Sequence, residues 1–233
     1  MKNCVVTGGS KGIGLAIAKR FAKECHVTLV ARNIKSLEEA LGTLPNPEHH
    51  SVHECNVADE HAIYDLGRAF RGKKVDYLIN SAGITQSSLL LGMKPKVLHS
   101  IIDTNLNGTI LSTQALLRPI MSAQGSILNI SSVLASRGLP GTSVYAASKA
   151  GVEAFTRSIS SELRSRKVRA NCLALGLVDT DMGKSVSQEV HDHFINSTFG
   201  RLLTVDEVAD AAYAVATNEA FSGAIVPLDG GYV

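Results

Sequence analysis

The sequence predicts an α/β fold, built as one doubly wound parallel sheet of about seven strands with helices on both faces. Short β-branched, apolar runs alternate with longer stretches of helical period along all 233 residues. Most of the strand-like runs lack a polar alternation, which is typical of strands covered on both sides. The sequence shows no internal repeat and no Pro- or Ser-rich linker, so we expect a single domain spanning residues 1–233.

Seven segments are predicted as strands, because each is a short apolar run that ends near Gly, Asn or Asp. They are residues 4–7, 27–31, 51–55, 77–80, 126–130, 168–173 and 224–227. Parallel strands need crossover connections, and the helical stretches between these runs are long enough to provide them.

The first helix follows the first strand directly. Ile13, Ile17 and Phe21 are spaced by four residues and share one face, which we expect to pack on the sheet. The same period predicts helices at residues 36–44, 60–70, 97–121, 145–165 and 205–216. The 97–121 unit is long or broken, and we expect Pro119 to end it because proline has no amide hydrogen to donate.

A glycine-rich turn, residues 7–14 with the sequence TGGSKGIG, joins the first strand to the first helix. Glycines let the backbone turn sharply and approach a ligand, and the free amides and positive dipole of a helix start favour an anion. The turn therefore predicts a site for a dinucleotide pyrophosphate. Taken alone, the pattern also fits a plain strand-to-helix turn.

Charges near this turn indicate which dinucleotide is bound. An NAD site expects an acidic residue about 20 residues after the first glycine, to hold the ribose 2′-hydroxyl. The chain has no Asp or Glu between Cys25 and Leu37, whereas Arg32 ends the second strand and Lys11 lies in the turn. Both cations can reach a 2′-phosphate, so we expect NADP(H); the alternative is two solvated surface charges.

The strongest chemical signal is the pair Tyr145 and Lys149. Their spacing of four places a phenol and an ammonium group on one helical face, about one turn apart. Ser132 follows the fifth strand, at the edge where open α/β sheets bind ligands. The alternative is that the pair belongs to the polar side of an amphipathic helix and that Ser132 is a turn residue.

These motifs, in this order, resemble the short-chain dehydrogenase/reductase family, which has a Rossmann-type fold. The resemblance covers essentially the whole chain. Residues 7–14 are similar to the family's TGxxxGIG loop, 80–83 to its NNAG strand end, 174–176 to its PG turn and 229–231 to its DGG motif. The resemblance implies a catalytic tetrad, whose members here are Asn105, Ser132, Tyr145 and Lys149.

The resemblance also implies which residues bind NADP(H). They are Gly8, Ser10, Lys11, Gly12, Ile13, Gly14, Arg32, Asn56, Val57, Asn80, Ala82, Gly83, Tyr145, Lys149, Gly176, Val178 and Thr180. Two positions depart from the family pattern. Asn56 replaces an Asp that faces the adenine, and its uncharged oxygen is a weaker acceptor. Leu175 replaces the proline of the PG turn, which removes a fixed φ and predicts a more mobile loop.

In this family, a hydride passes between the nicotinamide and a carbonyl carbon while a proton passes to the oxygen. The resemblance implies that Tyr145 donates this proton and that Lys149 stabilises its anion and holds the nicotinamide ribose. It implies that Ser132 donates a hydrogen bond to the oxygen and that Asn105 anchors a water linking Lys149 to solvent. A phenol has an ordinary pKa of about 10, so it needs nearby positive charge to exchange protons near neutrality.

Within the family, the chain is most similar to the 3-oxoacyl-[acyl-carrier-protein] reductases and related carbonyl reductases, because residues 200–208 resemble their GRxxxxxEV segment. We therefore expect reduction of a 3-oxoacyl thioester, on acyl carrier protein or CoA, in fatty-acid synthesis. The alternatives are a quinone or general carbonyl reductase and a non-enzymatic NADP(H)-binding scaffold subunit. A substrate lid is expected at residues 181–199.

An acidic carrier protein would dock on a basic surface. Arg164, Arg166, Lys167 and Arg169 cluster after the catalytic helix, and Arg166 falls where the related reductases have a docking arginine. Cations there are also favoured by the helix dipole without any partner. Residues 122–124 lack a second basic residue often seen in those reductases, which counts against tight docking. Relatives usually form tetramers, so the resemblance implies a homotetramer, or a heterotetramer with a homologue.

Composition argues against other classes of function. The 23 basic and 21 acidic residues give a net charge of +2, too close to balance to indicate nucleic acid. No apolar run reaches the roughly 18 residues of a membrane-spanning helix. We expect no metal site, because the histidines that cluster in sequence are interpreted as loop or surface residues: His49, His50, His53, His191 and His193.

The cysteines and the start of the chain indicate a compartment. The four cysteines, Cys4, Cys25, Cys55 and Cys172, show no C-x-x-C spacing and are expected to be buried thiols in a reducing environment. Strand-like sequence begins almost at once, so we expect no leader. These features favour the cytoplasm, with the mitochondrial matrix as the alternative.

Overall fold

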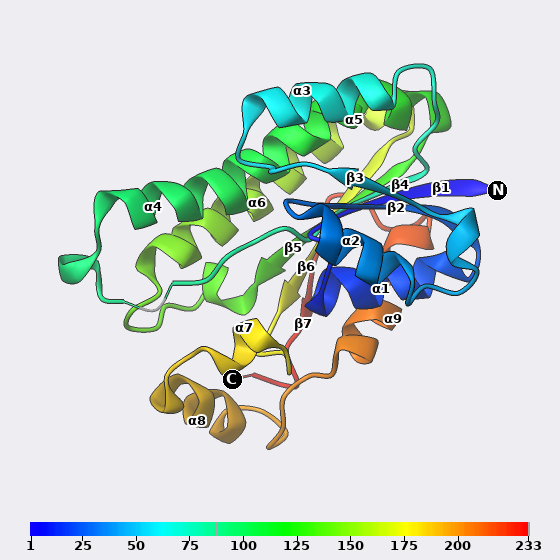
Figure 1. Ribbon diagram of the computed structural model, residues 1–233. Helices are drawn as coiled ribbons and strands as arrows, with labels where there is room; N and C mark the ends of the chain where they lie inside the picture. Colours follow the sequence, from blue (N-terminus) through cyan, green and yellow to red (C-terminus); the bar gives the residue numbers. More distant parts are fainter. Residues whose placement is uncertain (87, 233) are drawn as a thin grey trace.

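The computed structural model describes residues 1–86 and 88–232, and its strands form one seven-stranded parallel sheet (Figure 1). The strand order β3-β2-β1-β4-β5-β6-β7 confirms the doubly wound fold. The strands are β1 (Lys2–Thr7), β2 (Cys25–Ala31), β3 (Ser51–Glu54), β4 (Tyr77–Asn80), β5 (Ser126–Ser132), β6 (Arg169–Leu175) and β7 (Ile225–Leu228). The direction of winding reverses between β1 and β4, and ligands of such sheets bind at that point.

Helices occupy every stretch in which the sequence shows a helical period, with ends within three residues of those predicted. In the described residues the helices are α1 (Gly12–Ala22), α2 (Ile34–Leu41), α3 (Glu60–Ala69), α4 (Pro95–Ile102), α5 (Gly108–Ala123), α6 (Ser143–Glu162), α7 (Asp181–Lys184), α8 (Gln188–Asn196) and α9 (Val205–Thr217), of which α7 and α8 lie outside the predicted stretches. A π-helical turn, Asp103–Asn107, breaks the predicted 97–121 unit into α4 and α5.

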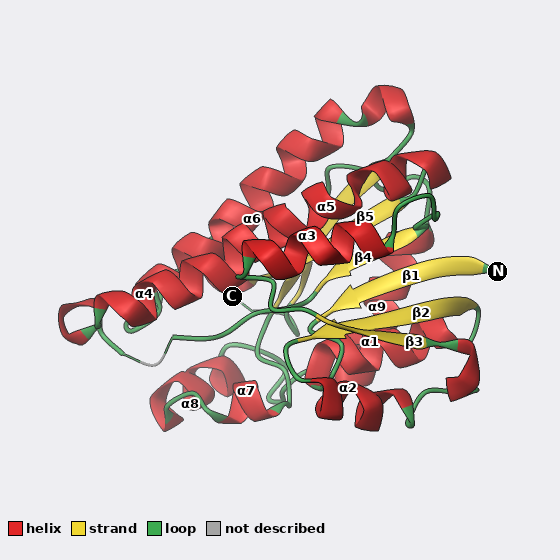
Figure 2. Cartoon of the chain, turned by 45° about the horizontal axis from the view of Figure 1, so that its top comes forward, coloured by secondary structure: helices red, strands yellow, loops and turns green. Residues whose placement is uncertain are grey.

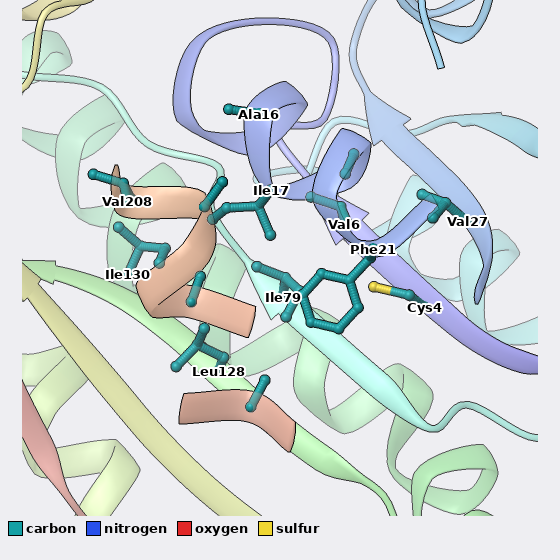
Figure 3. Close-up of a cluster of buried hydrophobic side chains, with 14 of the residues drawn as sticks. Cys4, Val6, Ala16, Ile17, Phe21, Val27, Ile79, Leu128, Ile130 and Val208 are labelled. Carbon is teal, nitrogen blue, oxygen red and sulfur yellow. The ribbon is translucent and has the colours of Figure 1, made fainter. Parts of the chain in front are cut away.

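Helices cover both faces of the sheet (Figure 2), and each layer of helices packs on the sheet through an apolar core. On one face α1 and α9 pack side by side, and the predicted α1 face buries Ile17 and Phe21 against Ile79 of β4 (Figure 3). On the other face α3, α5 and α6 cover the sheet, with Leu116 and Ile159 among their buried residues. Burial on both faces explains why the strands show no polar alternation.

The prediction that Pro119 ends a helix is wrong. Pro119 lies inside α5, which continues to Ala123 and ends at Gln124 in the left-handed conformation (φ 52°). The proline ring is buried, and its carbonyl still accepts hydrogen bonds from Val75 N (3.2 Å) and Ser122 Oγ (2.9 Å). Tertiary packing therefore outweighs the one backbone hydrogen bond that proline removes.

The predicted lid segment, residues 181–199, contains two helices that its weak periodicity did not predict. Each begins with a side-chain cap. Thr180 Oγ1 accepts from Gly183 N (3.0 Å) at the start of α7, and Ser187 Oγ accepts from Val190 N (3.4 Å) at the start of α8. Such caps satisfy amide groups that a helix start leaves unpaired, and they stabilise helices too short to form alone.

All four cysteines are buried free thiols, as predicted. Burial raises the pKa of Cys25 and Cys55 to about 11 and that of Cys172 to about 12. A thiol reacts as its thiolate, so these side chains are protonated and inert near neutral pH. Among residues 1–86 and 88–232, no helix has the length and apolar character needed to cross a bilayer, and no His, Cys, Asp and Glu side chains gather in a group able to hold a metal ion.

A histidine cluster lies where β2 pairs with the edge strand β3. His50 accepts Val27 N at Nδ1 (3.1 Å) and bonds the Pro45 carbonyl through Nε2 (2.9 Å). His53 lies within β3 and is half-buried, rather than at the surface or in a loop as expected. Burial lowers the pKa of both His26 and His53, and the His50 ring adds to the effect on His26.

These histidines predict a loss of stability on acidification. Their folded-state pKa values lie below the ordinary 6.5, so the unfolded chain takes up protons that the folded chain resists. Their contribution is fully present above pH 6.5 and is lost as the pH falls through the lowered values. We expect the urea midpoint to fall between pH 7.5 and pH 5.5, and the fall to shrink in the double variant His26→Gln, His53→Gln. The exposed His49→Gln is the matched control, and an unchanged pH dependence in the double variant would refute the assignment.

Candidate active site

A cavity of about 1380 Å³ lies at the carboxyl ends of the strands. Its wall is built from the segments that directly follow β1 to β6, which is where a doubly wound sheet collects its ligand-binding residues. The wall contains every predicted cofactor-binding residue except Asn80, and every predicted catalytic residue except Asn105.

The glycine turn before α1 forms one end of the cavity and fits a pyrophosphate. A side chain at Gly14 would collide with the Gly8 carbonyl, so Gly14 allows the turn to fold back on itself. At Gly12 (φ +55°) an added Cβ would lie in ordinary contact with Thr180 Cγ2, at 3.7 Å, and both residues line the cavity. Within the described chain, no side chain caps the start of α1, and its amides are available to an anion.

Lys11 and Arg32 line the cavity beside this turn, as expected for a 2′-phosphate site. Glu39, on α2, also lines the cavity. It follows the interval from Cys25 to Leu37, which contains no Asp or Glu. Asn33 caps α2 by accepting Ser36 N (3.0 Å), which fixes the chain directly after Arg32. This end of the cavity therefore carries two cations and one carboxylate.

Asn56 and Val57, which the family resemblance places near the adenine, follow β3 and line the cavity. Asn56 Oδ1 accepts Ala58 N (3.3 Å), so part of its acceptor capacity is used locally. Leu175, the second departure from the family pattern, is the buried last residue of β6, and the next amide, Gly176 N, donates to Leu228 O (2.9 Å). The sheet thus holds the backbone here without a proline.

Ser132, Tyr145 and Lys149 lie close together in the wall of the cavity. Ser132 ends β5 and accepts Leu134 N (3.2 Å), which orients its hydroxyl. Lys149 Nζ donates to Ile130 O (2.8 Å) and lies 5.8 Å from the centre of the Tyr145 ring. The structure therefore brings together the three residues that the sequence placed on β5 and α6.

Burial changes the acidity of this group. It lowers the pKa of Lys149 to about 8, because an ammonium group loses solvation when only 6% of the residue is exposed. It raises the pKa of the Tyr145 phenol, while the nearby Ser132 hydroxyl opposes the shift. Near neutral pH Tyr145 is thus a protonated donor, and Lys149 can exchange a proton readily.

Asn105 lies in the π-helical turn beneath the cavity and is fully buried. Its Oδ1 accepts Ile84 N (2.8 Å), and its Nδ2 donates to Ile84 O (2.9 Å) and Ser148 Oγ (3.1 Å). Asn105 therefore ties the segment after β4 to α6. Its backbone carbonyl accepts Thr109 Oγ1 (2.8 Å), and the role of anchoring a water stays a prediction.

Asn80 is buried behind the cavity, outside the wall in which it was expected. Its Nδ2 donates to Thr113 Oγ1 (3.0 Å) on α5 and to Asn129 Oδ1 (2.9 Å) on β5, and Asn129 Nδ2 donates to Thr156 Oγ1 (2.9 Å) on α6. The four side chains link two strands to two helices. The structure gives Asn80 a place in this internal network rather than a contact with the cavity.

The predicted basic cluster is smaller than expected, because Arg169 is not part of the free surface. Its guanidinium donates to three backbone carbonyls at and after the end of α9, those of Ala216 (2.6 Å), Asn218 (2.9 Å) and Phe221 (3.1 Å). Arg169 therefore caps α9. Arg164, Arg166 and Lys167 remain exposed.

Two features of the site carried no signal in the sequence. Gln86, on the segment after β4, lines the cavity and hydrogen-bonds the start of α6. His193 and Phe194 are on α8, in the predicted lid segment. His193 Nε2 and Tyr232 Oη are 2.7 Å apart, and the Phe194 and Tyr232 rings stack with centroids 4.9 Å apart. The Gln86 partners are 58 and 59 residues away in sequence and the Tyr232 partners 39 and 38, so only the fold reveals these contacts.

Comparisons with known proteins agree with this geometry. The family model for short chain dehydrogenase matches residues 2–191. The chain is 36% identical to the 3-oxoacyl-[acyl-carrier-protein] reductase FabG of Chlamydia muridarum, over 99% of this chain and 96% of that protein. It is 37% identical to carbonyl reductase family member 4 of Danio rerio, over 97% and 96%.

A solved structure with a very similar fold is a gluconate 5-dehydrogenase from Burkholderia cenocepacia in complex with NADP and tartrate. It superposes with a TM-score of 0.92 at 26% identity, over 99% of this chain and 94% of that one. Both sequence and fold relatives therefore match the chain from end to end. The chain belongs to the short-chain dehydrogenase/reductase family, whose members are oxidoreductases acting on CH–OH and C=O groups.

Proposed function

We propose that the protein uses NADPH to reduce the ketone of a 3-oxoacyl thioester to a secondary alcohol, as in fatty-acid synthesis. The observation that carries this proposal is the convergence of Ser132, Tyr145 and Lys149 on the cavity that the glycine turn also lines. A phenol that stays protonated, a hydroxyl and a buried ammonium group are what a carbonyl oxygen needs as it gains charge and a proton.

The cavity wall supports NADP(H) as the cofactor, which supplies the hydride to the carbonyl carbon when bound. The amides at the start of α1 would hold its pyrophosphate, and Lys11 and Arg32 would hold its 2′-phosphate. Asn56 and Val57 would contact the adenine. Gly176, Val178 and Thr180, after β6, would border the nicotinamide end.

Tyr145 would transfer its phenolic proton to the carbonyl oxygen. Ser132 would donate a hydrogen bond to the same oxygen, a contact that strengthens as negative charge develops. Lys149 would stabilise the phenolate through its charge, and its pKa of about 8 suits it to pass a proton back to Tyr145 at neutral pH.

The walls near Tyr145 support an acyl substrate. Several apolar side chains line the cavity there: Leu89, Leu134, Leu139, Val186, Val190 and Phe194. A fatty acyl chain would bury apolar surface against them. The reductase relatives at about 35% identity support the same substrate class.

The second candidate is a quinone or general carbonyl reductase, which is favoured by the likeness to carbonyl reductase family member 4. A scaffold without activity is disfavoured, because such a subunit has no need for Ser132, Tyr145 and Lys149 to face one cavity. For the thioester reductase we further propose a tetramer of single-domain subunits. Acyl carrier protein would dock at Arg164, Arg166 and Lys167.

Removal of the acid tests the reaction. Tyr145→Phe keeps the ring but deletes the proton donor, so kcat for reduction of acetoacetyl-CoA by NADPH should fall by about 10²–10⁴-fold. Binding of NADPH, followed by its fluorescence, should be retained. Tyr64→Phe, on the exposed face of α3, is the control. Parent-level turnover by Tyr145→Phe would refute the assignment of the donor, and a wild-type preference for quinones over thioesters would favour the second candidate.

Cofactor choice depends on Arg32 and Lys11. Replacing either with Ala should raise KM for NADPH by roughly 10-fold or more, because a charge-assisted hydrogen bond to phosphate is lost. KM for NADH should change little. Arg71→Ala, remote from the cavity, controls for net charge. An equal loss with both cofactors would contradict a 2′-phosphate site.

Carrier docking predicts a difference between two forms of one substrate. Arg166→Glu should raise KM for acetoacetyl-acyl carrier protein several-fold, on the order of 3- to 10-fold, because it places like charges opposite each other. KM for acetoacetyl-CoA should be unchanged. Arg68→Glu, on α3, provides the matched charge reversal. If Arg166→Glu treats both substrates alike, the docking surface lies elsewhere.

A further inference from the structure

The helix that carries Tyr145 has no local cap at its start. Thr142 is the N-cap residue of α6, but its hydroxyl is occupied within the preceding loop. It donates to Leu139 O (2.7 Å) and accepts Leu139 N (3.3 Å). The first amide groups of α6 therefore need another acceptor, because a buried, unpaired amide is costly.

Gln86 supplies that acceptor from a distant segment. Its Oε1 accepts two backbone amides of the first turn of α6, Val144 N (2.8 Å) and Tyr145 N (3.0 Å). Its Nε2 donates to Ser88 O (2.8 Å), and only 6% of the residue is exposed. Every polar atom of the side chain is thus used, and one of its bonds is to the amide of Tyr145 itself.

The segment that carries Gln86 is fixed at its other end to the cofactor turn. Thr7 Oγ1 accepts both Ser81 N (3.2 Å) and Ala82 N (3.3 Å). Further along, Asn105 holds the amide and the carbonyl of Ile84. Residues 81–86 therefore bridge the strand that precedes the glycine turn and the helix that presents the phenol.

The cap on α6 is also electrically neutral. Carboxylates are common at helix starts because the dipole favours negative charge there. A carboxylate at position 86 would satisfy the same amides, but it would place an anion beside the residue that must release a proton. A nearby negative charge stabilises the protonated phenol and makes it a weaker acid.

We propose that Gln86 is a positioning residue for Tyr145: it caps α6 from the segment after β4 and keeps that cap uncharged. The inference rests on the proposed function in assigning Tyr145 as the proton donor. The proposal predicts that two changes at position 86 have different effects. One change removes the cap, and the other adds a charge to an intact cap.

Two variants separate these two changes. Gln86→Met keeps the length but removes the acceptor, so kcat should fall by about 10-fold or more as the phenol loses its fixed place, while KM for NADPH stays within about two-fold. Gln86→Glu keeps the acceptor and adds a charge, so the limb of the pH profile that reports Tyr145 should move to higher pH. Gln114→Glu, exposed on α5, adds the same charge away from the site and should change neither.

A purely structural cap would give a different result. In that case Gln86→Met would lower the melting temperature but leave kcat unchanged at temperatures where the variant is folded, and Gln86→Glu would leave the pH profile in place. Either finding would overturn the proposal.

A readout without turnover keeps this test independent of the proposed reaction. The tyrosinate absorbance of each protein, minus that of its Tyr145→Phe counterpart, titrates the Tyr145 phenol directly. If the wild-type protein reduces no ketone but the Tyr145 titration moves to higher pH in Gln86→Glu, the proposed reaction is refuted and the role of Gln86 is supported. Normal wild-type turnover with an unmoved titration would refute the inference about Gln86 alone.

Discussion

A buried ammonium group constrains the architecture of this protein more than any other single contact. Lys149 loses most of its hydration, and its one acceptor among the described residues is the carbonyl of Ile130 on β5. An isolated buried charge is unstable, so α6 must lie where this bond forms and where the cavity supplies polar surroundings. The lowered pKa of Lys149 is the chemical consequence of that placement. The helix, the strand and the acid–base chemistry are therefore fixed together.

Polar side chains inside the molecule give this arrangement its register. The network of Asn80, Thr113, Asn129 and Thr156 joins β4 and β5 to α5 and α6, and Asn105 adds a bond to Ser148. Apolar packing alone would allow a helix to shift slightly along a sheet. Here such a shift would leave buried amide groups unpaired, which is costly. Within the described residues, three buried side-chain oxygens have no hydrogen-bond partner: Asn80 Oδ1, Ser112 Oγ and Ser126 Oγ.

The sheet and the three residues at the cavity were predictable because their signals are local. An apolar run predicts a buried strand, and the four-residue spacing of Tyr145 and Lys149 predicts a shared face. Signals that depend on distant partners were invisible or misleading. Pro119 continues its helix because the fold buries its ring, Arg169 points at the end of α9 rather than at solvent, and Gln86 acts on an amide 59 positions away. Even Asn80, found by motif, serves the interior instead of the cavity.

The four buried thiols have a consequence for how this protein ages. Each sulfur lies in a core or strand environment and stays protonated, so peroxides and alkylating reagents meet no reactive cysteine on the described surface. Chemical damage at a cysteine sulfur would require the core to open first. The rate of cysteine modification would then report how often the native structure opens.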